Sequence, residues 1–142
     1  MEKGANRILT MDEIHYLLGN TCNLNCDFCC WDMRLPDSPF GFKKKIINQI
    51  VKTGIKKVTL SGGEPLCSND FLKVLGYMKK SGLEVILHSN GLKINKSIAE
   101  KISPFISRVS LILDGPDEKI VSKMMERWEV PNLTEAHLVT TI

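Results

Sequence analysis

Three cysteines lie within one short polar segment near the start of the chain, Cys22-Asn23-Leu24-Asn25-Cys26-Asp27-Phe28-Cys29, at a C-x3-C-x2-C spacing. Thiolates are the ligands that proteins supply to iron–sulfur clusters. Three thiolates bind three irons of a four-iron cluster and leave the fourth iron open to something other than protein. The segment therefore predicts a metal centre in which one iron is available for chemistry.

A second polar segment, Ser61-Gly62-Gly63-Glu64-Pro65, follows the apolar run Val58-Thr59-Leu60. Paired glycines have no Cβ and tolerate positive φ, so the backbone can approach a ligand closely. Glu64 adds a carboxylate beside backbone carbonyls, an acceptor set that suits a positively charged amino group. Alone, the segment favours a tight turn in which Pro65 opens the next helix.

The two remaining cysteines are expected to have other roles. Five cysteines, four of them crowded between Cys22 and Cys30, indicate metal or redox chemistry in a reducing compartment rather than a disulfide framework. Cys30 adjoins Cys29, and neighbouring residues on a tight loop seldom reach the same cluster, so Cys30 is expected not to be a ligand. Cys67 is expected to be a small, partly buried thiol.

Short apolar runs alternate with amphipathic stretches along the chain, which predicts βαβ crossovers and a parallel sheet. Ser68 or Asn69 is the expected cap of the second helix, and Gly82 follows the end of that helix. The expected strands are 14–18, 58–60, 85–88, 109–113 and 136–142, and the expected helices are 42–52, 69–80, 94–102 and 117–127.

Composition is that of an ordinary globular domain, with 43% hydrophobic residues, 25% charged residues and a net charge of +3 over 142 residues. The chain has no apolar run of membrane-spanning length and no signal-peptide pattern, so a soluble cytoplasmic protein is expected. The lysine clusters Lys43-Lys44-Lys45 and Lys56-Lys57 fit solvated positions beside helices and argue against a nucleic-acid-binding role.

The chemistry-bearing segments all follow expected strands. The cysteines follow the first strand, Gly62-Gly63-Glu64 the second, Ser89-Asn90-Gly91 the third and Asp114-Gly115-Pro116 the fourth. Ligands of parallel α/β folds bind at the carboxyl ends of the strands. The four loops are therefore expected to form one site.

These segments resemble the radical S-adenosylmethionine (radical SAM) superfamily over residues 14–117. Cys22, Cys26 and Cys29 match the family's cysteine motif, and Phe28 stands where the family usually has an aromatic residue. The other three segments are similar to its Gly-Gly-Glu, Thr-Asn-Gly and Leu-Asp-Gly-Pro elements. The combination is similar to the branch that includes molybdenum-cofactor and peptide-maturation enzymes.

The resemblance implies cofactors and a reaction. Cys22, Cys26 and Cys29 would ligate a 4Fe-4S cluster, and the amino and carboxylate groups of S-adenosylmethionine would chelate the open iron. Reductive cleavage would yield methionine and a 5′-deoxyadenosyl radical that abstracts hydrogen from a substrate. The resemblance also implies a flavodoxin-like or ferredoxin-like electron donor. It assigns neither a substrate nor a catalytic residue.

The resemblance further implies cofactor-binding residues. The Gly62-Gly63-Glu64 segment would receive the methionine amino group, and Phe28 would pack near the cluster and the adenosine. Asn90 and Asp114 would line the rim of the site.

Three positions near these segments are not part of the matched motifs. The family commonly has a serine where this chain has Ile112, with Ser110 two residues earlier. His88, at the end of the third strand, is expected to be structural, and Trp31 is expected to cover the cluster.

Length limits the fold that the sequence can build. A complete (β/α)8 barrel needs about 250 residues, and the 142-residue chain ends at the fifth expected strand. We expect one incomplete domain over residues 1–142, a parallel partial TIM barrel of about five strands and four helices. Three explanations stay open: a truncated chain, a half-site completed by a partner chain or second copy as in a homodimer, and a minimal enzyme.

Two alternatives to an enzyme also stay open. In one, the chain binds a cluster and S-adenosylmethionine but catalyses nothing. In the other, Cys22, Cys26, Cys29 and either Cys30 or His15 form a structural zinc site, although the usual paired C-x2-C knuckles are absent.

Overall fold

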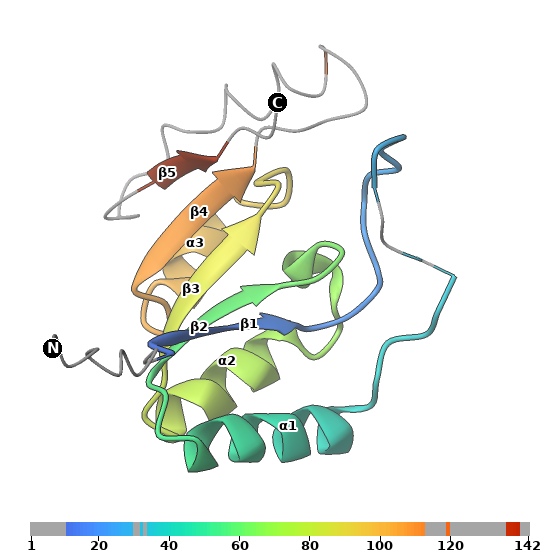
Figure 1. The fold of residues 1–142 in the computed structure, drawn as a ribbon. Coiled ribbons are helices and arrows are strands. Elements are labelled where there is room, and N and C mark those ends of the chain that lie inside the picture. Colours follow the sequence, from blue (N-terminus) through green and yellow to red (C-terminus); the bar gives the residue numbers. More distant parts are fainter. Residues whose placement is uncertain (1–10, 30–31, 33, 113–118, 120–135, 140–142) are drawn as a thin grey trace, which may run out of the picture.

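The computed structural model describes residues 11–29, 32, 34–112, 119 and 136–139. Within these ranges, five parallel strands form one sheet in the order β1-β2-β3-β4-β5 (Figure 1). The strands are β1 (Glu13–Leu17), β2 (Lys57–Ser61), β3 (Glu84–Ser89), β4 (Arg108–Ile112) and β5 (Ala136–Val139). The helices are α1 (Phe40–Lys52), the 3₁₀ helix η1 (Pro65–Cys67), α2 (Phe71–Lys80) and α3 (Lys96–Ile102).

Each strand pairs in parallel with the next strand along the chain, and the connecting helices cover one face of the sheet (Figure 1). This arrangement is part of a (β/α) barrel, because crossovers in sequence order wind the sheet in one direction. The predicted parallel partial barrel is therefore confirmed. The predicted helix 117–127 falls almost wholly outside the described residues.

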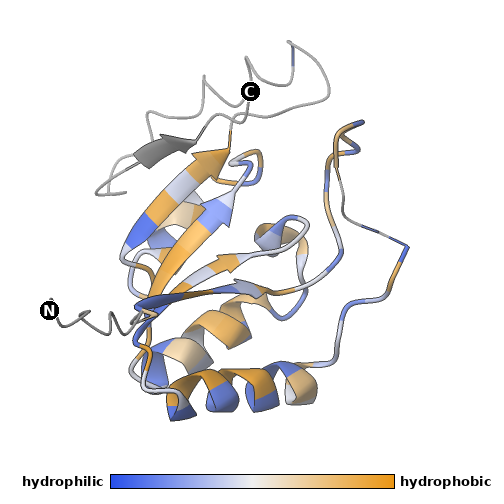
Figure 2. Ribbon diagram, viewed as in Figure 1, coloured by the Kyte–Doolittle hydropathy of each residue, from blue (hydrophilic) through white to orange (hydrophobic). Residues whose placement is uncertain are grey.

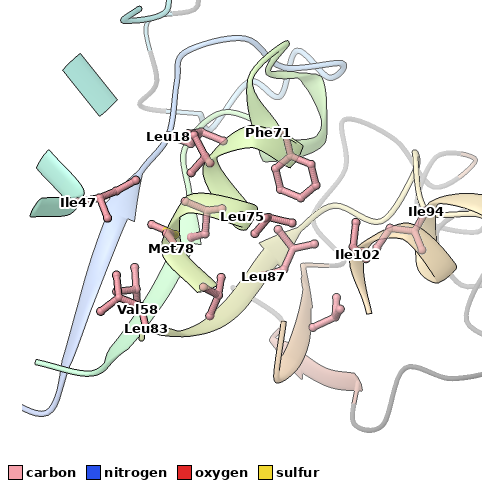
Figure 3. Packing of buried hydrophobic residues seen from close by; sticks show 14 of the residues in the cluster. Leu18, Ile47, Val58, Phe71, Leu75, Met78, Leu83, Leu87, Ile94 and Ile102 are labelled. Carbon is pink, nitrogen blue, oxygen red and sulfur yellow. The ribbon is translucent and has the colours of Figure 1, made fainter. Parts of the chain in front are cut away.

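The hydrophobic core lies between the sheet and the helices. Val58 and Leu60 on β2 and Leu87 on β3 contribute alternate side chains to it, and Ile47 of α1 and Met78 of α2 pack against them (Figure 3). Hydrophilic residues of α1 lie on the side of that helix that faces away from the sheet (Figure 2). No helix within the described ranges is both long enough and apolar enough to cross a membrane.

The sheet face away from the helices is more polar. Side chains alternate between the two faces along a strand, so Thr59, His88 and Ser110 lie on this second face, opposite their core-facing neighbours. The Thr59 hydroxyl donates a hydrogen bond to the Glu13 carboxylate on the adjacent strand. In a closed barrel, this face would be the interior.

The start of α2 differs from the prediction. The residue before its first turn is Asp70, without a side-chain capping bond, and neither Ser68 nor Asn69 caps the helix. The predicted end is confirmed: Gly82 has a φ of +76°, and the N–H of Leu83 donates to the Met78 carbonyl at 3.1 Å.

Lys43 corrects the prediction that its lysine cluster is solvated. Its side chain is 1% exposed. The Lys43 ammonium donates to the Ser68 hydroxyl at 3.2 Å and lies 3.5 Å from the Asp70 carboxylate. The sequence predicted solvated positions for all three lysines because nothing local distinguishes them, but the helical turn places only Lys43 against the start of α2. Lys43 thus joins α1 to the segment that follows Glu64.

Replacing Lys43 is expected to destabilise the fold. Lys43→Ala removes a buried stem and strands its two polar partners, and should lower the free energy of unfolding by about 2–3 kcal/mol in urea denaturation. Lys43→Met retains the apolar stem and should lose about half as much. Exposed Lys45→Ala is the matched control, with a change within about 0.5 kcal/mol. Equal stability of the two alanine variants would contradict the assigned role.

Candidate functional site

The cysteine loop and the Gly-Gly-Glu segment are held together by backbone hydrogen bonds. The pairing of β1 and β2 continues past both strands: Leu18 donates to the Ser61 carbonyl at 2.8 Å. Gly63 donates to the Gly19 carbonyl at 3.0 Å, and Glu64 donates to the Thr21 carbonyl at 2.9 Å. The last of these bonds is made by Thr21, the residue before Cys22. The backbone that leads into the first motif cysteine is therefore held in place.

Gly62 and Gly63 are required by this close approach. A Cβ on Gly62 would lie 2.7 Å from the Gly19 carbonyl oxygen, and the residue has a φ of +136°. A Cβ on Gly63 would lie 2.5 Å from the Thr21 carbonyl oxygen. The sequence predicted that the glycines allow a ligand to approach closely. In the structure they allow the close approach of the backbone that leads to the cysteines.

Asp37 anchors the same backbone from the other side. Its carboxylate accepts hydrogen bonds from the backbone N–H groups of Asn20 at 2.6 Å and Thr21 at 3.2 Å. Burial opposes ionisation of Asp37, but these bonds outweigh it and lower the pKa of the carboxyl group. Sequence reasoning missed Asp37, because no motif marks an aspartate that acts on a loop 16 residues earlier.

Glu64 is a buried connector between two loops. Its carboxylate is part of a side chain only 2% exposed. One oxygen accepts from the Leu66 N–H at 3.1 Å and the Ser89 hydroxyl at 2.8 Å, and the other accepts from the Asn90 N–H at 2.8 Å. The sequence suggested that this carboxylate is open to a ligand. In the structure it is instead engaged by protein donors.

Backbone acceptors remain beside this connector. Within the described part of the chain, the carbonyl oxygens of Gly62 and Gly63 accept no hydrogen bond. Burial raises the pKa of Glu64, and the hydrogen bonds from Asn90, Ser89 and Leu66 oppose that rise. The segment thus presents two carbonyl dipoles at the carboxyl edge of the sheet, while its charged group is turned inward.

The three motif cysteines lie on one loop. Cys22 and Cys26 are half-buried and Cys29 is exposed. Burial raises the pKa of the Cys22 thiol, and the Leu24 N–H, 3.5 Å from the sulfur, opposes this shift. The backbone folds back on itself here, because Cys29 donates to the Cys26 carbonyl at 3.0 Å.

The donors on this loop are thiols, the ligands that iron–sulfur clusters take from proteins. Among the described residues, no three histidine, cysteine, aspartate or glutamate side chains could hold one metal ion together. An iron–sulfur cluster spreads its thiolate ligands over different irons, so three cysteines on one loop fit it. His15, a candidate zinc ligand, lies instead beside Glu13 at 3.6 Å, and Cys30 is outside the described residues.

The other predicted site residues fall in different places. Phe28 is 66% exposed at the tip of the cysteine loop, and Asn90 is buried at the end of β3. Asp114 and Trp31 are outside the described residues. Cys67 is partly buried in η1, as predicted.

His88 and Ser110 are register partners on the polar face of the sheet. The Nε2 atom of His88 is buried and has no hydrogen-bond partner among the described residues. Burial, followed by repulsion from His15, lowers the pKa of His88 and favours a neutral imidazole. Ser110 and Ile112 are two residues apart, so they share this face.

Comparison with known proteins identifies the class. The Radical SAM superfamily profile matches residues 16–136, and the chain belongs to this superfamily. Its fold is the one that the resemblance implied, and the family uses an iron–sulfur cluster and S-adenosylmethionine.

Individual relatives come from the same branch as the one suggested by the sequence. The chain is 31% identical over 110 residues to a GTP 3',8-cyclase from Synechococcus sp., covering 72% of this chain and 32% of the relative. It is 24% identical over 123 residues to an S-adenosylmethionine-dependent nucleotide dehydratase from Lacinutrix mariniflava, covering 81% and 26%. The chain thus spans about a third or less of these relatives.

The fold is also that of a solved radical SAM structure. Native anSMEcpe with bound AdoMet and Kp18Cys peptide superposes with a TM-score of 0.66 at 19% identity. The match covers 90% of this chain and 42% of that one. At this identity the likeness establishes the partial barrel fold.

Adding a methyl group at either site glycine is expected to separate the two loops. Gly62→Ala and Gly63→Ala should each lower the free energy of unfolding by about 2–4 kcal/mol, because the Cβ meets backbone that cannot yield cheaply. Gly76→Ala in α2, whose Cβ would meet its nearest neighbour at 4.0 Å, is the control and should raise stability by about 0.5–1 kcal/mol. Urea denaturation of the apoprotein measures all three.

The buried carboxylate predicts a pH dependence of stability. Because the folded-state pKa of Glu64 lies above its ordinary 4.5, the stability it contributes is present below pH 4.5 and is lost as pH rises through the raised pKa. The unfolding free energy of the wild-type apoprotein minus that of Glu64→Gln should therefore shrink from pH 4.5 towards neutrality. A difference that stays flat or grows with pH contradicts this assignment.

Proposed function

We propose that this chain is the cofactor-binding core of a radical SAM enzyme. Cys22, Cys26 and Cys29 hold a 4Fe-4S cluster, and S-adenosylmethionine lies between that loop and the Gly62-Gly63 backbone. When bound, these cofactors supply a reductively generated 5′-deoxyadenosyl radical for hydrogen abstraction. The observation that carries the proposal is the direct backbone pairing of the cysteine loop with the Gly-Gly-Glu segment at 2.9–3.0 Å.

Different residues of the chain are proposed to contact different parts of the two cofactors. The free carbonyl oxygens of Gly62 and Gly63 receive the methionine amino group, since the Glu64 carboxylate is already engaged by three donors. Phe28, exposed beside Cys29, is proposed to cover the cluster and the adenosine. Asp114 is proposed to line the rim, as the resemblance implies.

The wider setting follows from the family. Radical SAM proteins need a reductant and a substrate, and we propose a flavodoxin-like or ferredoxin-like donor and a cytoplasmic location, where thiols stay reduced. Residues 1–142 are proposed to form a single domain. A homodimer or a completing partner chain is proposed as a route to closing the partial barrel. The substrate is left unassigned.

Anaerobic reconstitution tests the function. The protein is treated with iron and sulfide, reduced with dithionite and given S-adenosylmethionine, and the expected product is 5′-deoxyadenosine, detected by chromatography. Cys26→Ala should abolish the cluster, whereas Cys67→Ala, a matched cysteine outside the loop, should retain it.

The outcomes separate the alternatives. A cluster without 5′-deoxyadenosine would support a cofactor-binding protein without catalysis. Zinc retained in place of a cluster, or a full cluster in Cys26→Ala, would overturn the assignment of the cysteines.

A further inference from the structure

A pair of asparagines connects the end of β3 to the cysteine loop. The side-chain amide nitrogen of Asn90 donates to the Asn23 side-chain oxygen at 2.8 Å. The two residues are 67 positions apart in the sequence. Asn23 directly follows Cys22, so this bond reaches the first residue after a motif thiol.

The Asn90 side chain is used at both ends. Its amide nitrogen is committed to Asn23, and its amide oxygen accepts from the Leu92 N–H at 3.1 Å. Asn90 is also 9% exposed and held through its own N–H by the Glu64 carboxylate at 2.8 Å. A side chain placed in this way is suited to fix another residue and has little freedom to contact a cofactor.

Asn23 also contacts the side chain of Cys22. The same Asn23 oxygen that accepts from Asn90 lies 4.0 Å from the Cys22 sulfur. The sulfur in turn accepts from the Leu24 N–H at 3.5 Å. The Cys22 sulfur thus contacts the Asn23 side-chain oxygen and the Leu24 N–H. The position of both groups depends on the bond between Asn23 and Asn90.

We propose that Asn90 and Asn23 are positioning residues that orient the Cys22 thiolate toward the cluster. Glu64 fixes Asn90, Asn90 fixes Asn23, and Asn23 fixes the turn that brings the Leu24 N–H to the Cys22 sulfur. The Leu24 N–H can donate to a thiolate, whereas the Asn23 oxygen accepts only from the protonated thiol. The cofactor-lining role first expected of Asn90 is replaced by this indirect one. The inference rests on the proposed cluster at Cys22, Cys26 and Cys29.

The arrangement has a measurable consequence for the cluster. Groups that orient a metal ligand typically contribute 10–100-fold to metal affinity. Losing either asparagine should therefore speed the removal of iron by a chelator about tenfold and change the electron paramagnetic resonance spectrum of the reduced cluster. Both readouts are independent of substrate turnover.

The experiment compares Asn23→Ala, Asn90→Ala and the double variant in reconstituted protein. The two single variants should show the same change, and the double variant no further change, because each breaks the same bond. Asn23→Asp keeps the accepting oxygen and should retain the wild-type spectral line shape. Asn23 is exposed, so its variants test the inference even if Asn90→Ala fails to fold.

Asn95→Ala is the matched control. Asn95 caps α3 by accepting from the Ile98 N–H at 3.0 Å, so its loss should lower thermal stability and leave the spectrum and the rate of iron loss unchanged. Wild-type cluster behaviour in both Asn23→Ala and Asn90→Ala would overturn the inference. Failure of the wild type to assemble any cluster would instead overturn the proposed function.

Discussion

The buried carboxylate of Glu64 is the interaction on which the carboxyl edge of the sheet depends. It joins the loops after β2 and β3 through the Leu66 N–H, the Ser89 hydroxyl and the Asn90 N–H. A carboxylate is costly to remove from water, and a complete set of donors is what offsets that cost. Separating the loops would leave the carboxylate and its donors unpaired, so the backbone around Gly62 and Gly63 is held in one arrangement.

Backbone contact then carries this order to the loop after β1. Gly62 and Gly63 let Gly19 and Thr21 approach closely enough to pair, and Asp37 secures the opposite side of that segment. The base of the cysteine loop is therefore fixed while Cys29 at its far end is exposed. Such a gradient suits a loop that must accept an inorganic cluster and then hold it.

The sequence predicted the repeated elements and the edge where the site lies, because alternating apolar runs and the order of polar loops are local signals. It placed Val58–Leu60 in a strand and Gly82 after a helix correctly. It missed the burial of Lys43 and the engagement of Glu64, because both depend on partners that only folding brings near: Asp70, 27 residues after Lys43, and Asn90, 26 residues after Glu64. The sequence states which side chains are charged, but it does not show which partners folding brings next to them.

The fourth strand shows how a departure from the family pattern takes physical form. Ser110 lies on the same sheet face as Ile112, the position at which the resemblance led us to expect a serine, but two residues or about 6.6 Å further from the carboxyl edge. At that depth it is paired with His88, whose buried Nε2 has no partner among the described residues. The hydroxyl of this strand thus lies within the sheet instead of at its carboxyl edge. Polar contacts at that edge fall to the loops that follow the strands, and the interior face holds a serine beside a buried imidazole.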